Sequence, residues 1–525
     1  MTDAQKSSEA SKSSSPLSAA QLNRLLNFAF IVGCLAVFVL ITFANVAEPD
    51  IWGHTRFGED ILRLRQIPTA DPYSYVNQGF FCIDHEWLFD VMMACWYQLS
   101  GVLGLVLFKG LLVAALVGLL ILPLRQAGFG LFPGAFVILF ALQVMGPGIV
   151  VIRPHLFTYL FFAAVCLILR EATIGSSKWL WLLPVIIIPW ANIHGGFLSG
   201  LSVILAWAVV QSIVLFRAGD RMVDIRRIWL VVIVSFAAHL VNPFGPRLLE
   251  FLVPVIRSMQ LEIGEWNPLA INSESGMYYL ACCAAMLLSL FFTERKRQPS
   301  FVVIMSLMLI APLSAKRHLA LLVIAMIVFG AEHLASVTQQ LARALQLKSF
   351  SDFSWHGKLV MTVAFLVTAG YIVPQVARIF GRIVPMRGLP VASVNLLKEL
   401  KVEGNMVPFF DWGEYIIYHL GPRVKVSIDG RRETAYPINV YRDNVAFTDG
   451  VYQWDAILER YPSNMVLIPK GLACYSLMKL KPGWTLVYED DSSSLFIRNG
   501  SPVIAQIQER LKTGKPIDST ETGFP

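Results

Sequence analysis

The sequence predicts a polytopic α-helical membrane protein that carries a soluble α/β domain at its C-terminal end. Of the 525 residues, 55% are hydrophobic and only 15% are charged. A soluble protein of this length needs far more charged surface, so the apolar excess is expected to face lipid. The long apolar runs lie between Leu25 and Tyr371, whereas the sequence after Pro385 has an ordinary globular composition.

About eleven apolar runs are expected to cross the membrane, because a helix needs roughly 20 apolar residues to span the hydrocarbon core and tilt allows some variation. The expected spans are Leu25–Val46, Val102–Leu124, Phe129–Pro147, His155–Leu169, Trp179–Asn192, Phe197–Phe216, Ile228–Val241, Met277–Phe292, Phe301–Leu313, Leu319–His333 and Leu359–Pro374. The first run lacks a convincing small-residue cleavage site, so we expect a retained span and not a cleaved signal peptide.

The loops between these runs predict the orientation of the chain. Every second loop is rich in Lys and Arg, and the N-terminal tail is also basic. The cations of these loops are Arg125, Arg170, Lys178, Arg217, Arg221, Arg226, Arg227, Arg295, Lys296, Arg297, Arg343, Lys348 and Lys358. Cytoplasmic loops carry such an excess, so we expect the N-terminus in the cytoplasm and, after an odd number of spans, the C-terminus outside. Because the cations sit in short loops and form no stripe, nucleic acid is not an expected partner.

These patterns divide the chain into a tail, a membrane domain and an exported domain. Residues 1–22 are expected to be a disordered cytoplasmic tail, 23–384 a transmembrane domain with an exported first loop at 48–101, and 385–525 the exported domain. In the exported domain, helical and strand-like segments alternate, which predicts a small α/β domain with a partly parallel sheet. The helical segments are Val391–Lys401 and Trp412–Leu420, and the strand-like segments are Asn405–Phe410, Val424–Ile428, Asn464–Ile468 and Leu495–Arg498.

The first long loop opens with a candidate catalytic carboxylate. Its first motif, Asp50-Ile51-Trp52-Gly53-His54, begins an amphipathic segment at Ile51–Leu64. Amphipathic helices suit the membrane interface, where Trp52 is expected at headgroup level. A partly desolvated carboxylate at Asp50 can accept a proton or position a cation. Taken alone, an Asp that precedes a helix is more commonly an N-cap, and this alternative stays open.

The same loop ends with a second group of ionisable residues. Asp84-His85-Glu86 precedes another amphipathic segment, Glu86–Leu99. Adjacent His85 and Glu86 point in different directions on a helix, so they are not a metal pair by themselves. If the loop folds back, Asp50 or His54 could complete a divalent-metal site with them. The alternative is that these are interfacial polar residues exposed to water.

Further polar residues are expected on the face that bears Asp50. They are Arg153, His155, Asn192, His194, Glu265, Arg317 and His318, all at turns between apolar runs. Cations that converge at this interface suit the phosphate or pyrophosphate of a lipid carrier. The alternative is that they only anchor lipid headgroups.

A turn in the exported domain is the last candidate site. Asp429-Gly430-Arg431 follows a predicted strand, where ligand sites of α/β sheets tend to lie. Arg431 could pair with an acidic or phosphorylated acceptor. Asp-Gly is also an ordinary turn sequence, so a structural role is the alternative.

The layout resembles the GT-C superfamily, whose members are membrane glycosyltransferases that use polyprenyl-phosphate sugars. An acidic residue directly after the first span and two interfacial helices in the first loop carry this resemblance. Several motifs are similar, more specifically, to a bacterial family of mostly uncharacterised GT-C-like membrane proteins. These motifs are Asp50–His54, Pro68–Tyr75, His85–Leu88, Trp190–Gly196, Asn242-Pro243 and the segment from Trp412-Gly413 to Asp429-Gly430-Arg431. The resemblance covers most of the chain.

The resemblance implies transfer of a sugar from a polyprenyl-phosphate donor to a glycan, lipid or protein acceptor. The reaction would take place at the outer face of a bacterial inner membrane, with the C-terminal domain in the periplasm. Asp50 matches the catalytic carboxylate, which acts as a base or positions the acceptor. By placement, Arg153 and Arg317 are expected to hold the lipid phosphate. The paired acidic motif of several GT-C families is replaced here by Asp50 with His54, so a metal requirement stays open.

Two other classes of function are compatible with the same residues. A transporter or flippase for a lipid-linked glycan would carry the same cations without chemistry. A non-catalytic membrane scaffold would use the exported domain to bind a partner. The sequence shows no inverted repeat of the kind found in many transporters, which argues against the first of these.

Overall fold

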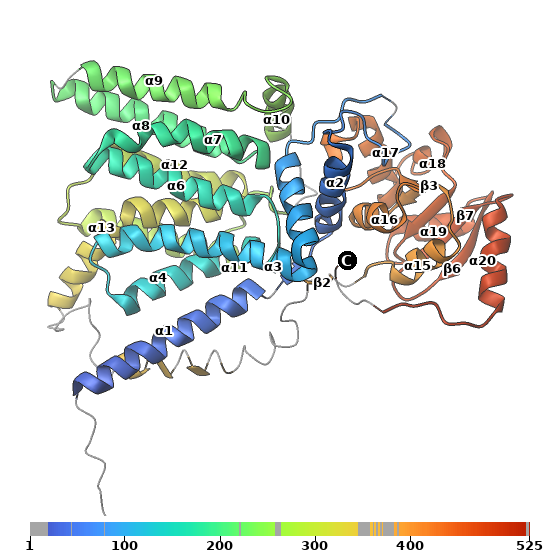
Figure 1. Ribbon diagram of the computed structural model, residues 1–525, viewed down its shortest axis with the longest axis horizontal. Coiled ribbons are helices and arrows are strands. Elements are labelled where there is room, and N and C mark those ends of the chain that lie inside the picture. The colour runs from blue at the N-terminus through green and yellow to red at the C-terminus, as the bar shows by residue number, and fades with distance from the viewer. Residues whose placement is uncertain are drawn as a thin grey trace, which may run out of the picture.

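The computed structural model describes residues 19–43, 45–77, 79–219, 222–257, 264–344, 357–360, 362–363, 366–367, 370, 383–385, 388–520 and 524. Figure 1 shows a bundle of helices beside a smaller region built around a sheet. Helix α2 (Asp50–Leu64) and the first turns of α3 (Trp87–Gln126) lie between the two. The candidate site is built at this junction.

The bundle consists of apolar helices. Its described helices are α1 (Ala19–Phe43), α3, α4 (Leu131–Val144), α5 (Gly146–Ile149), α6 (His155–Ile174), α7 (Leu182–Ile193), α8 (Phe197–Arg217), α9 (Met222–Ala238), α10 (Arg247–Arg257), α11 (Glu274–Phe292), α12 (Pro299–Ser314) and α13 (Leu319–Ala344), with the short helices η1 (Ser177–Trp181) and η2 (Lys316–His318). Within the part of the chain that the structure describes, five segments are long and apolar enough to cross a membrane, namely α3, α6, α8, α11 and α13 with η2. Phe216 and Phe291 are 72% and 77% exposed, as suits lipid-facing side chains. The chain is therefore a membrane protein.

The expected spans can be compared with these helices one by one. Each span from Leu25–Val46 to Leu319–His333 coincides with a described helix. The span Leu359–Pro374 lies largely outside the described residues, as does nearly all of the tail at 1–22. The total of about eleven spans therefore stays a prediction.

A bend in α3 marks the boundary between the interfacial helix and the span that follows it. The label α3 covers two helices joined at a kink, where Ser100 and Gly101 leave the helical conformation and Gly101 has φ +60°. Glycine adopts this left-handed conformation without steric cost. The half of α3 before the bend packs against α2, where a Cβ on Gly58 would lie 1.9 Å from the carbonyl oxygen of Asp90. Gly58 thus allows the two helices to approach closely.

The C-terminal region contains a five-stranded sheet in the order β4-β3-β5-β7-β6. Strand β3 is parallel to β4 and β5, whereas β7 is antiparallel to β5 and β6. The elements are α15 (Val391–Glu399), β3 (Gly404–Pro408), η3 (Phe410–Trp412), α16 (Gly413–Leu420), β4 (Val424–Val426), η4 (Arg432–Thr434), α17 (Ile438–Asp449), α18 (Ala456–Arg460), β5 (Met465–Ile468), α19 (Ala473–Leu480), β6 (Trp484–Glu489), β7 (Ser494–Arg498) and α20 (Pro502–Lys512). The four expected strand segments correspond to β3, β4, β5 and β7, and β6 was not expected.

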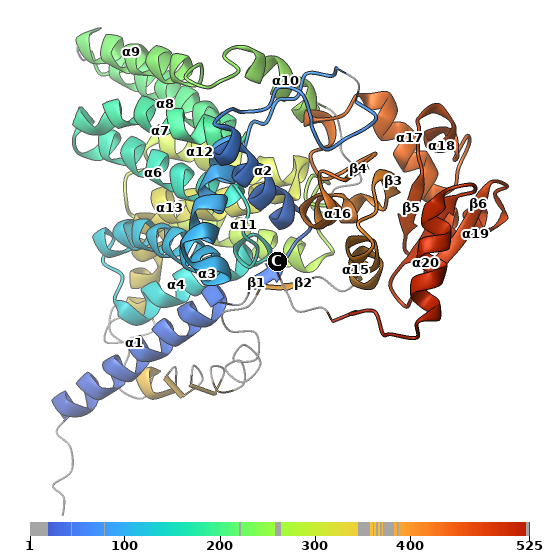
Figure 2. The same ribbon diagram turned by 45° about the vertical axis from the view of Figure 1, so that its right-hand side comes forward.

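Backbone pairing connects the first loop to the C-terminal region. Strand β1 (Asn45–Ala47), directly after α1, pairs in parallel with β2 (Ile383–Pro385), and Figure 2 shows the two side by side. Farther along the loop, the backbone N–H of Val426 in β4 donates to the carbonyl of Tyr73 over 2.9 Å. The loop therefore lies along the edge of the sheet and brings α2 against α16.

This packing corrects the expectation for Trp52. Its side chain is 1% exposed and meets the ring of Tyr415 in α16 edge-on, with centroids 5.2 Å apart. The amphipathic face of α2 is thus covered by the C-terminal region and not by lipid headgroups. A hydrophobic stripe shows that a face is covered, but the same stripe suits lipid and protein.

Candidate functional site

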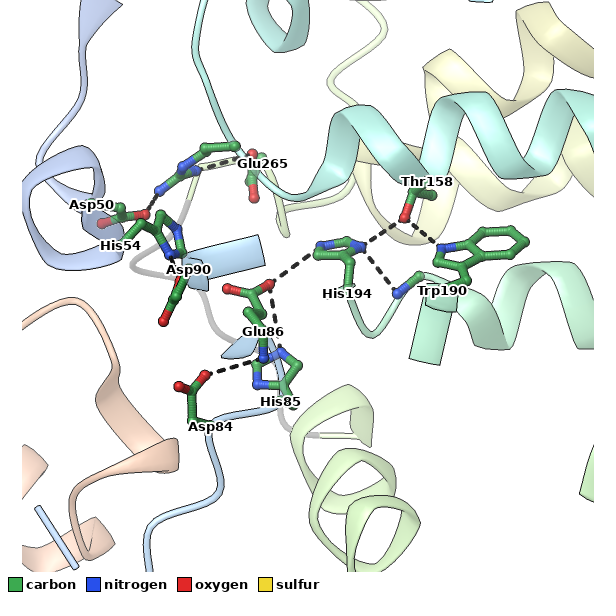
Figure 3. Close-up of polar contacts among 12 residues, drawn as sticks. Asp50, His54, Asp84, His85, Glu86, Asp90, Thr158, Trp190, His194 and Glu265 are labelled. Carbon is green, nitrogen blue, oxygen red and sulfur yellow. Dashed lines mark hydrogen bonds and ion pairs between the residues drawn. The ribbon is translucent and has the colours of Figure 1, made fainter. Parts of the chain in front are cut away.

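Asp50, labelled in Figure 3, is the first residue of α2. It forms an ion pair with Arg153, which lies just before α6. Nη2 of Arg153 contacts Oδ2 of Asp50, and Nε lies 2.7 Å from Oε2 of Glu48. Nη1 lies 4.0 Å from Oε2 of Glu265. The N-cap of α2 is Pro49, and no side chain caps the helix. The N-cap interpretation of Asp50 is therefore wrong, although a negative charge in the first turn still suits the helix dipole.

Carboxylates on several sides make Arg153 an internal cation. Burial works against its charge, but the surrounding carboxylates outweigh burial and raise its pKa above the ordinary value. Burial also raises the pKa of Glu48 to about 7, although Arg153 lowers it. Arg153 thus holds Asp50 in place. Because carboxylates already neutralise its guanidinium, it can bind a phosphate only if one of them moves away.

Glu86 lies between two histidines. Its Oε1 is 3.6 Å from Nε2 of His85 and 3.8 Å from Nε2 of His194. Burial raises the pKa of Glu86 to about 8 and lowers that of His85 to about 4. At neutral pH, Glu86 is therefore largely protonated and His85 is neutral, because buried charge is disfavoured on both.

Hydrogen bonds define the tautomer of His194 (Figure 3). The backbone N–H of Gly196 donates to Nδ1 of His194 over 3.1 Å, and Oγ1 of Thr158 lies 2.8 Å from the same nitrogen. A backbone N–H can only donate, so Nδ1 is the acceptor and the ring proton is on Nε2, toward Glu86. Thr158 accepts from Nε1 of Trp190 over 2.9 Å and donates its own proton to His194. Burial lowers the pKa of His194 well below its ordinary value, which agrees with a neutral ring.

His54 pairs with Asp90 and not with Asp50. Nδ1 of His54 lies 2.6 Å from Oδ1 of Asp90, and both residues are buried. Among the described residues, no group of three or more His, Cys, Asp or Glu side chains is placed to hold a metal ion. The folded-back loop thus brings Asp50, His54, His85 and Glu86 to one region without assembling them around one point.

The remaining candidates of the bundle form internal hydrogen bonds. Oδ1 of Asn192 accepts from Nε1 of Trp87 over 2.9 Å, and its amide nitrogen donates to backbone carbonyls. His155 and His318 each contact a backbone carbonyl, at 2.7 Å through Nε2 and at 3.1 Å through Nδ1. Each imidazole donates there, because a carbonyl can only accept. A direct role of these residues in substrate binding stays a prediction.

Arg317 differs from Arg153 in its surroundings. Its guanidinium lies 3.5 Å from the centroid of the Trp266 ring, and its backbone N–H donates to the carbonyl of Glu265 over 3.1 Å. An aromatic face stabilises a cation without neutralising it. Of the two arginines, Arg317 is therefore better suited to meet an anionic ligand.

Asp429 and Arg431 form a buried network with the first loop. Oδ1 of Asp429 accepts from the backbone N–H and Nε of Arg431, and Oδ2 accepts from Nη2. Nη1 of Arg431 donates to Oδ1 of Asp71 over 2.8 Å, and the guanidinium lies 4.6 Å from the centroid of the Phe57 ring. These contacts join the loop to the sheet region. Binding of an acceptor by Arg431 stays a prediction.

Glu414 in α16 is a site residue that the sequence interpretation missed. The residue is 4% exposed, and its Oε1 lies 2.6 Å from the point that a Cβ on Gly430 would occupy. Oδ1 of Asp50 lies 2.8 Å from the same point. Burial raises the pKa of Glu414 well above its ordinary value, and the carboxylates of Asp50 and Asp429 raise it further. The sequence signal was the motif that begins Trp412-Gly413, which Glu414 follows directly. Nothing in that motif indicates that Glu414 lies near Asp50.

The fold and the site together define a polytopic membrane protein in which a carboxylate after the first helix meets a C-terminal region. The fold is similar to that of archaeal oligosaccharyltransferases. The Archaeoglobus fulgidus oligosaccharyltransferase in its apo form aligns at 13% identity with a TM-score of 0.54, over 84% of this chain and 69% of that chain. The complex of A. fulgidus AglB with an inhibitory peptide and a dolichol-phosphate aligns at 13% identity with a TM-score of 0.55, over 91% and 74%.

A third solved structure gives the same result. The A. fulgidus enzyme tethered with an acceptor peptide containing the NVT sequon aligns at 11% identity with a TM-score of 0.52, over 84% of this chain and 69% of that chain. Oligosaccharyltransferases are GT-C glycosyltransferases, so this chain has a GT-C fold. At such low identity the likeness establishes the fold alone. No family model and no curated protein matches the sequence.

Proposed function

We propose that the chain is a glycosyltransferase that moves a sugar from a polyprenyl-phosphate donor to an acceptor at the outer face of a bacterial inner membrane. The observation that carries the proposal is the Asp50 carboxylate, which Arg153 holds at the junction of the bundle and the sheet region within a GT-C fold. The A. fulgidus enzyme is known in complex with a dolichol-phosphate and with an acceptor peptide. We extend these two ligand classes, a lipid-linked donor and an acceptor, to this chain.

Asp50 is the group that positions or deprotonates the acceptor. A bond forms between the acceptor heteroatom and the anomeric carbon of the donor sugar, while the bond from that carbon to the phosphate oxygen breaks. The acceptor proton passes to the Asp50 carboxylate, and the polyprenyl phosphate leaves with the electron pair. Attack opposite the leaving phosphate inverts the anomeric configuration. Catalytic roles of His54, His85 and Glu86 stay predictions.

Arg317 is the cation that holds the leaving phosphate in this proposal. Its guanidinium is stacked on Trp266 and keeps its charge, whereas that of Arg153 is engaged by carboxylates. A guanidinium can offer two parallel N–H groups to a phosphate. The two arginines therefore have different roles in this proposal. Arg153 orients Asp50, and Arg317 stabilises the polyprenyl phosphate as it leaves.

A transfer assay with the full-length protein tests the proposal. Purified protein with a panel of polyprenyl-phosphate sugars and candidate acceptors should release polyprenyl phosphate and form a glycosylated product. Asp50→Asn should lower turnover by at least about 100-fold, because general-base catalysis contributes 10²–10⁴-fold. The matched control is Glu59→Gln, a half-buried acid on the same helix, which should retain turnover. Full activity of Asp50→Asn would remove Asp50 from the mechanism.

Donor turnover separates this proposal from the two other classes. A transporter or flippase would bind the lipid-linked donor and move it across proteoliposomes without consuming it. A scaffold would neither turn over the donor nor move it. Donor binding without transfer for every acceptor tested, together with movement across the bilayer, would favour the transporter.

A further inference from the structure

Glycines from separate motifs surround Glu414. A Cβ on Gly53, in the first loop, would lie 2.1 Å from Oε2 of Glu414, and one on Gly430 would lie 2.6 Å from Oε1. A Cβ on Gly413, next to Glu414, would lie 2.4 Å from the carbonyl oxygen of Ile428. At Gly413 the close atom belongs to the backbone, so glycine is required there, whereas a side chain at Gly53 or Gly430 would displace the end of the Glu414 side chain. The three glycines let Glu414 enter the junction between α2 and the loop after β4.

The carboxyl group of Glu414 lies among other acids. Asp50 faces it from α2, Asp90 from α3, and Asp429 together with Arg431 from the loop after β4. Arg431 is already engaged by Asp429 and by a second acid in the first loop. Oε2 of Glu414 is buried and has no hydrogen-bond partner among the described residues. A negative charge on Glu414 would therefore be buried without compensation, which is costly.

The position of Oε1 indicates which group a proton on Glu414 can be donated to. Oε1 of Glu414 and Oδ1 of Asp50 crowd the same point beside Gly430, at 2.6 and 2.8 Å from it. Two carboxylates that converge on one buried point do not both ionise readily, and they commonly share one proton. Asp50 is the acid of this pair that also has a cation beside it, namely Arg153. The shared proton therefore belongs on Glu414.

We propose that Glu414 is a protonated carboxylic acid that donates its O–H to the Asp50 carboxylate and so acts as a positioning residue for Asp50. The proposal rests on the function proposed for Asp50, and it makes the C-terminal region a part of the site. Arg153 and Glu414 contact Asp50 from two separate parts of the chain: Arg153 lies just before α6, and Glu414 lies in α16. The Asp50 carboxylate is thereby kept in one orientation.

The proposal predicts how transfer depends on pH. At high pH, Glu414 loses its proton, the donated hydrogen bond disappears, and a second negative charge appears beside Asp50. Turnover should therefore fall on the alkaline side. The titratable and charged groups that face Glu414 are Asp50, Asp90, Asp429 and Arg431, and burial also raises the pKa of Asp90 well above its ordinary value.

A series of variants in the full-length protein tests the role. Glu414→Ala removes the donor and should lower kcat by about 10- to 100-fold, because a hydrogen bond to a charged group is worth roughly that factor. Glu414→Gln keeps a neutral donor of the same shape and should recover most of that loss, without the alkaline fall. Gly430→Ala places a methyl group against the ends of both side chains and should lower kcat while the protein still folds. A Gln variant as inactive as the Ala variant would overturn the proposal.

Infrared spectroscopy provides a readout that does not need transfer. The difference spectrum between the wild type and Glu414→Gln should show loss of the carbonyl band of a protonated carboxylic acid at neutral pH. If no such band is lost, Glu414 is ionised and the proposal is wrong, whatever the activity. If the band is lost but no lipid-linked sugar is turned over, the proposed function fails and the protonation of Glu414 stands. The two failures are therefore distinguishable.

Discussion

Arg431, after β4, and Asp71, in the first loop, form an ion pair in which Nη1 of Arg431 lies 2.8 Å from Oδ1 of Asp71. The Asp71 side chain is completely buried, and that of Arg431 is 14% exposed. Asp429 holds the other edge of the guanidinium, at 2.6 Å from Nη2. One arginine thus connects the loop that carries the candidate catalytic residue to the turn that carries Gly430.

Arg431→Ala should destabilise the protein strongly. It leaves the carboxylates of Asp71 and Asp429 buried without their cation, which typically costs about 3–5 kcal/mol. The thermal transition in detergent should fall, and limited proteolysis should cleave the first loop sooner. The matched control is Arg460→Ala, which breaks an exposed pair with Asp443 and should cost at most about 1 kcal/mol. Unchanged stability with weakened use of an acceptor would instead support Arg431 as a substrate ligand.

Thr158→Val should reduce transfer as well as stability. It removes the hydroxyl that accepts from Trp190 and donates to His194, so the imidazole loses one of its two supports. An unsatisfied buried donor costs about 1–3 kcal/mol. Thr173→Val is a close control, because Thr173 in the same helix accepts from Trp207 over 2.8 Å with no histidine involved. The control should lose stability alone, and equal loss of turnover in both variants would contradict a role for His194.

Glu86 should contribute a loss of stability as the pH rises from about 4.5 to about 8. The pKa of Glu86 is raised from its ordinary value of 4.5 to about 8 by burial. Below 4.5 the group is protonated in the folded and the unfolded chain, so it carries no penalty. As the pH rises, the unfolded chain releases its proton first, and the folded state becomes less favourable until its own pKa is passed. Glu86→Gln should flatten the dependence of the thermal transition on pH over this window.

The control for this titration is an acid whose pKa moves the other way. Glu399 is exposed, so its charge is not buried. Its hydrogen bond with Arg510 lowers its pKa. Glu399→Gln should leave the dependence above pH 4.5 unchanged. An identical pH profile for the wild type and Glu86→Gln would show that Glu86 is not held protonated.

Phe524→Ala should loosen the junction between α2 and α16. The residue is 4% exposed, and its ring lies 5.5 Å from that of Tyr97, 5.7 Å from Trp52 and 5.8 Å from Tyr418. Truncating a buried Phe typically costs about 3–5 kcal/mol. The measurement is the thermal transition together with the fluorescence of Trp52. Phe524→Leu retains most of the volume and should cost much less.

The orientation in the membrane stays a prediction that labelling can test. In a cysteine-free background, the Lys425→Cys variant should react with a membrane-impermeant maleimide added to spheroplasts. A cysteine at Lys296, in a basic loop, should react only after permeabilisation. The opposite pattern would place the sheet region in the cytoplasm.

Local sequence patterns predicted elements well and their partners poorly. Apolar runs located helices from Leu25–Val46 onward, because burial in lipid imposes long stretches of one composition. Strand β6 (Trp484–Glu489) was missed, since most of it is only half-buried and its apolar and polar residues do not alternate clearly. The expectation for Trp52 failed because amphipathicity does not identify what covers the apolar face.

The same distinction holds within the candidate site. Asp50 and Arg153 were both expected on one face, and the structure joins them in an ion pair. His54 was grouped with Asp50, yet it pairs with Asp90, because helix packing decides which of several nearby acids a side chain reaches. Glu414 lay in a motif that stood out, but its neighbours come from distant parts of the sequence. Only the pairing of β3 with β4 and of α2 with α16 brings it to Asp50.

The pairing of β1 with β2 has a consequence for how the protein is made. Ribosomes deliver the N-terminal part first, so Asp50 and Trp52 emerge long before the residues that cover them. Throughout insertion of the bundle, the nascent chain presents an uncovered tryptophan and a carboxylate without Glu414. Only when Ile383–Pro385 arrives beside Asn45–Ala47 can the later segments be guided onto α2. The packing around Asp50 and Trp52 is therefore complete only after the segments that follow Ile383–Pro385 have been synthesised.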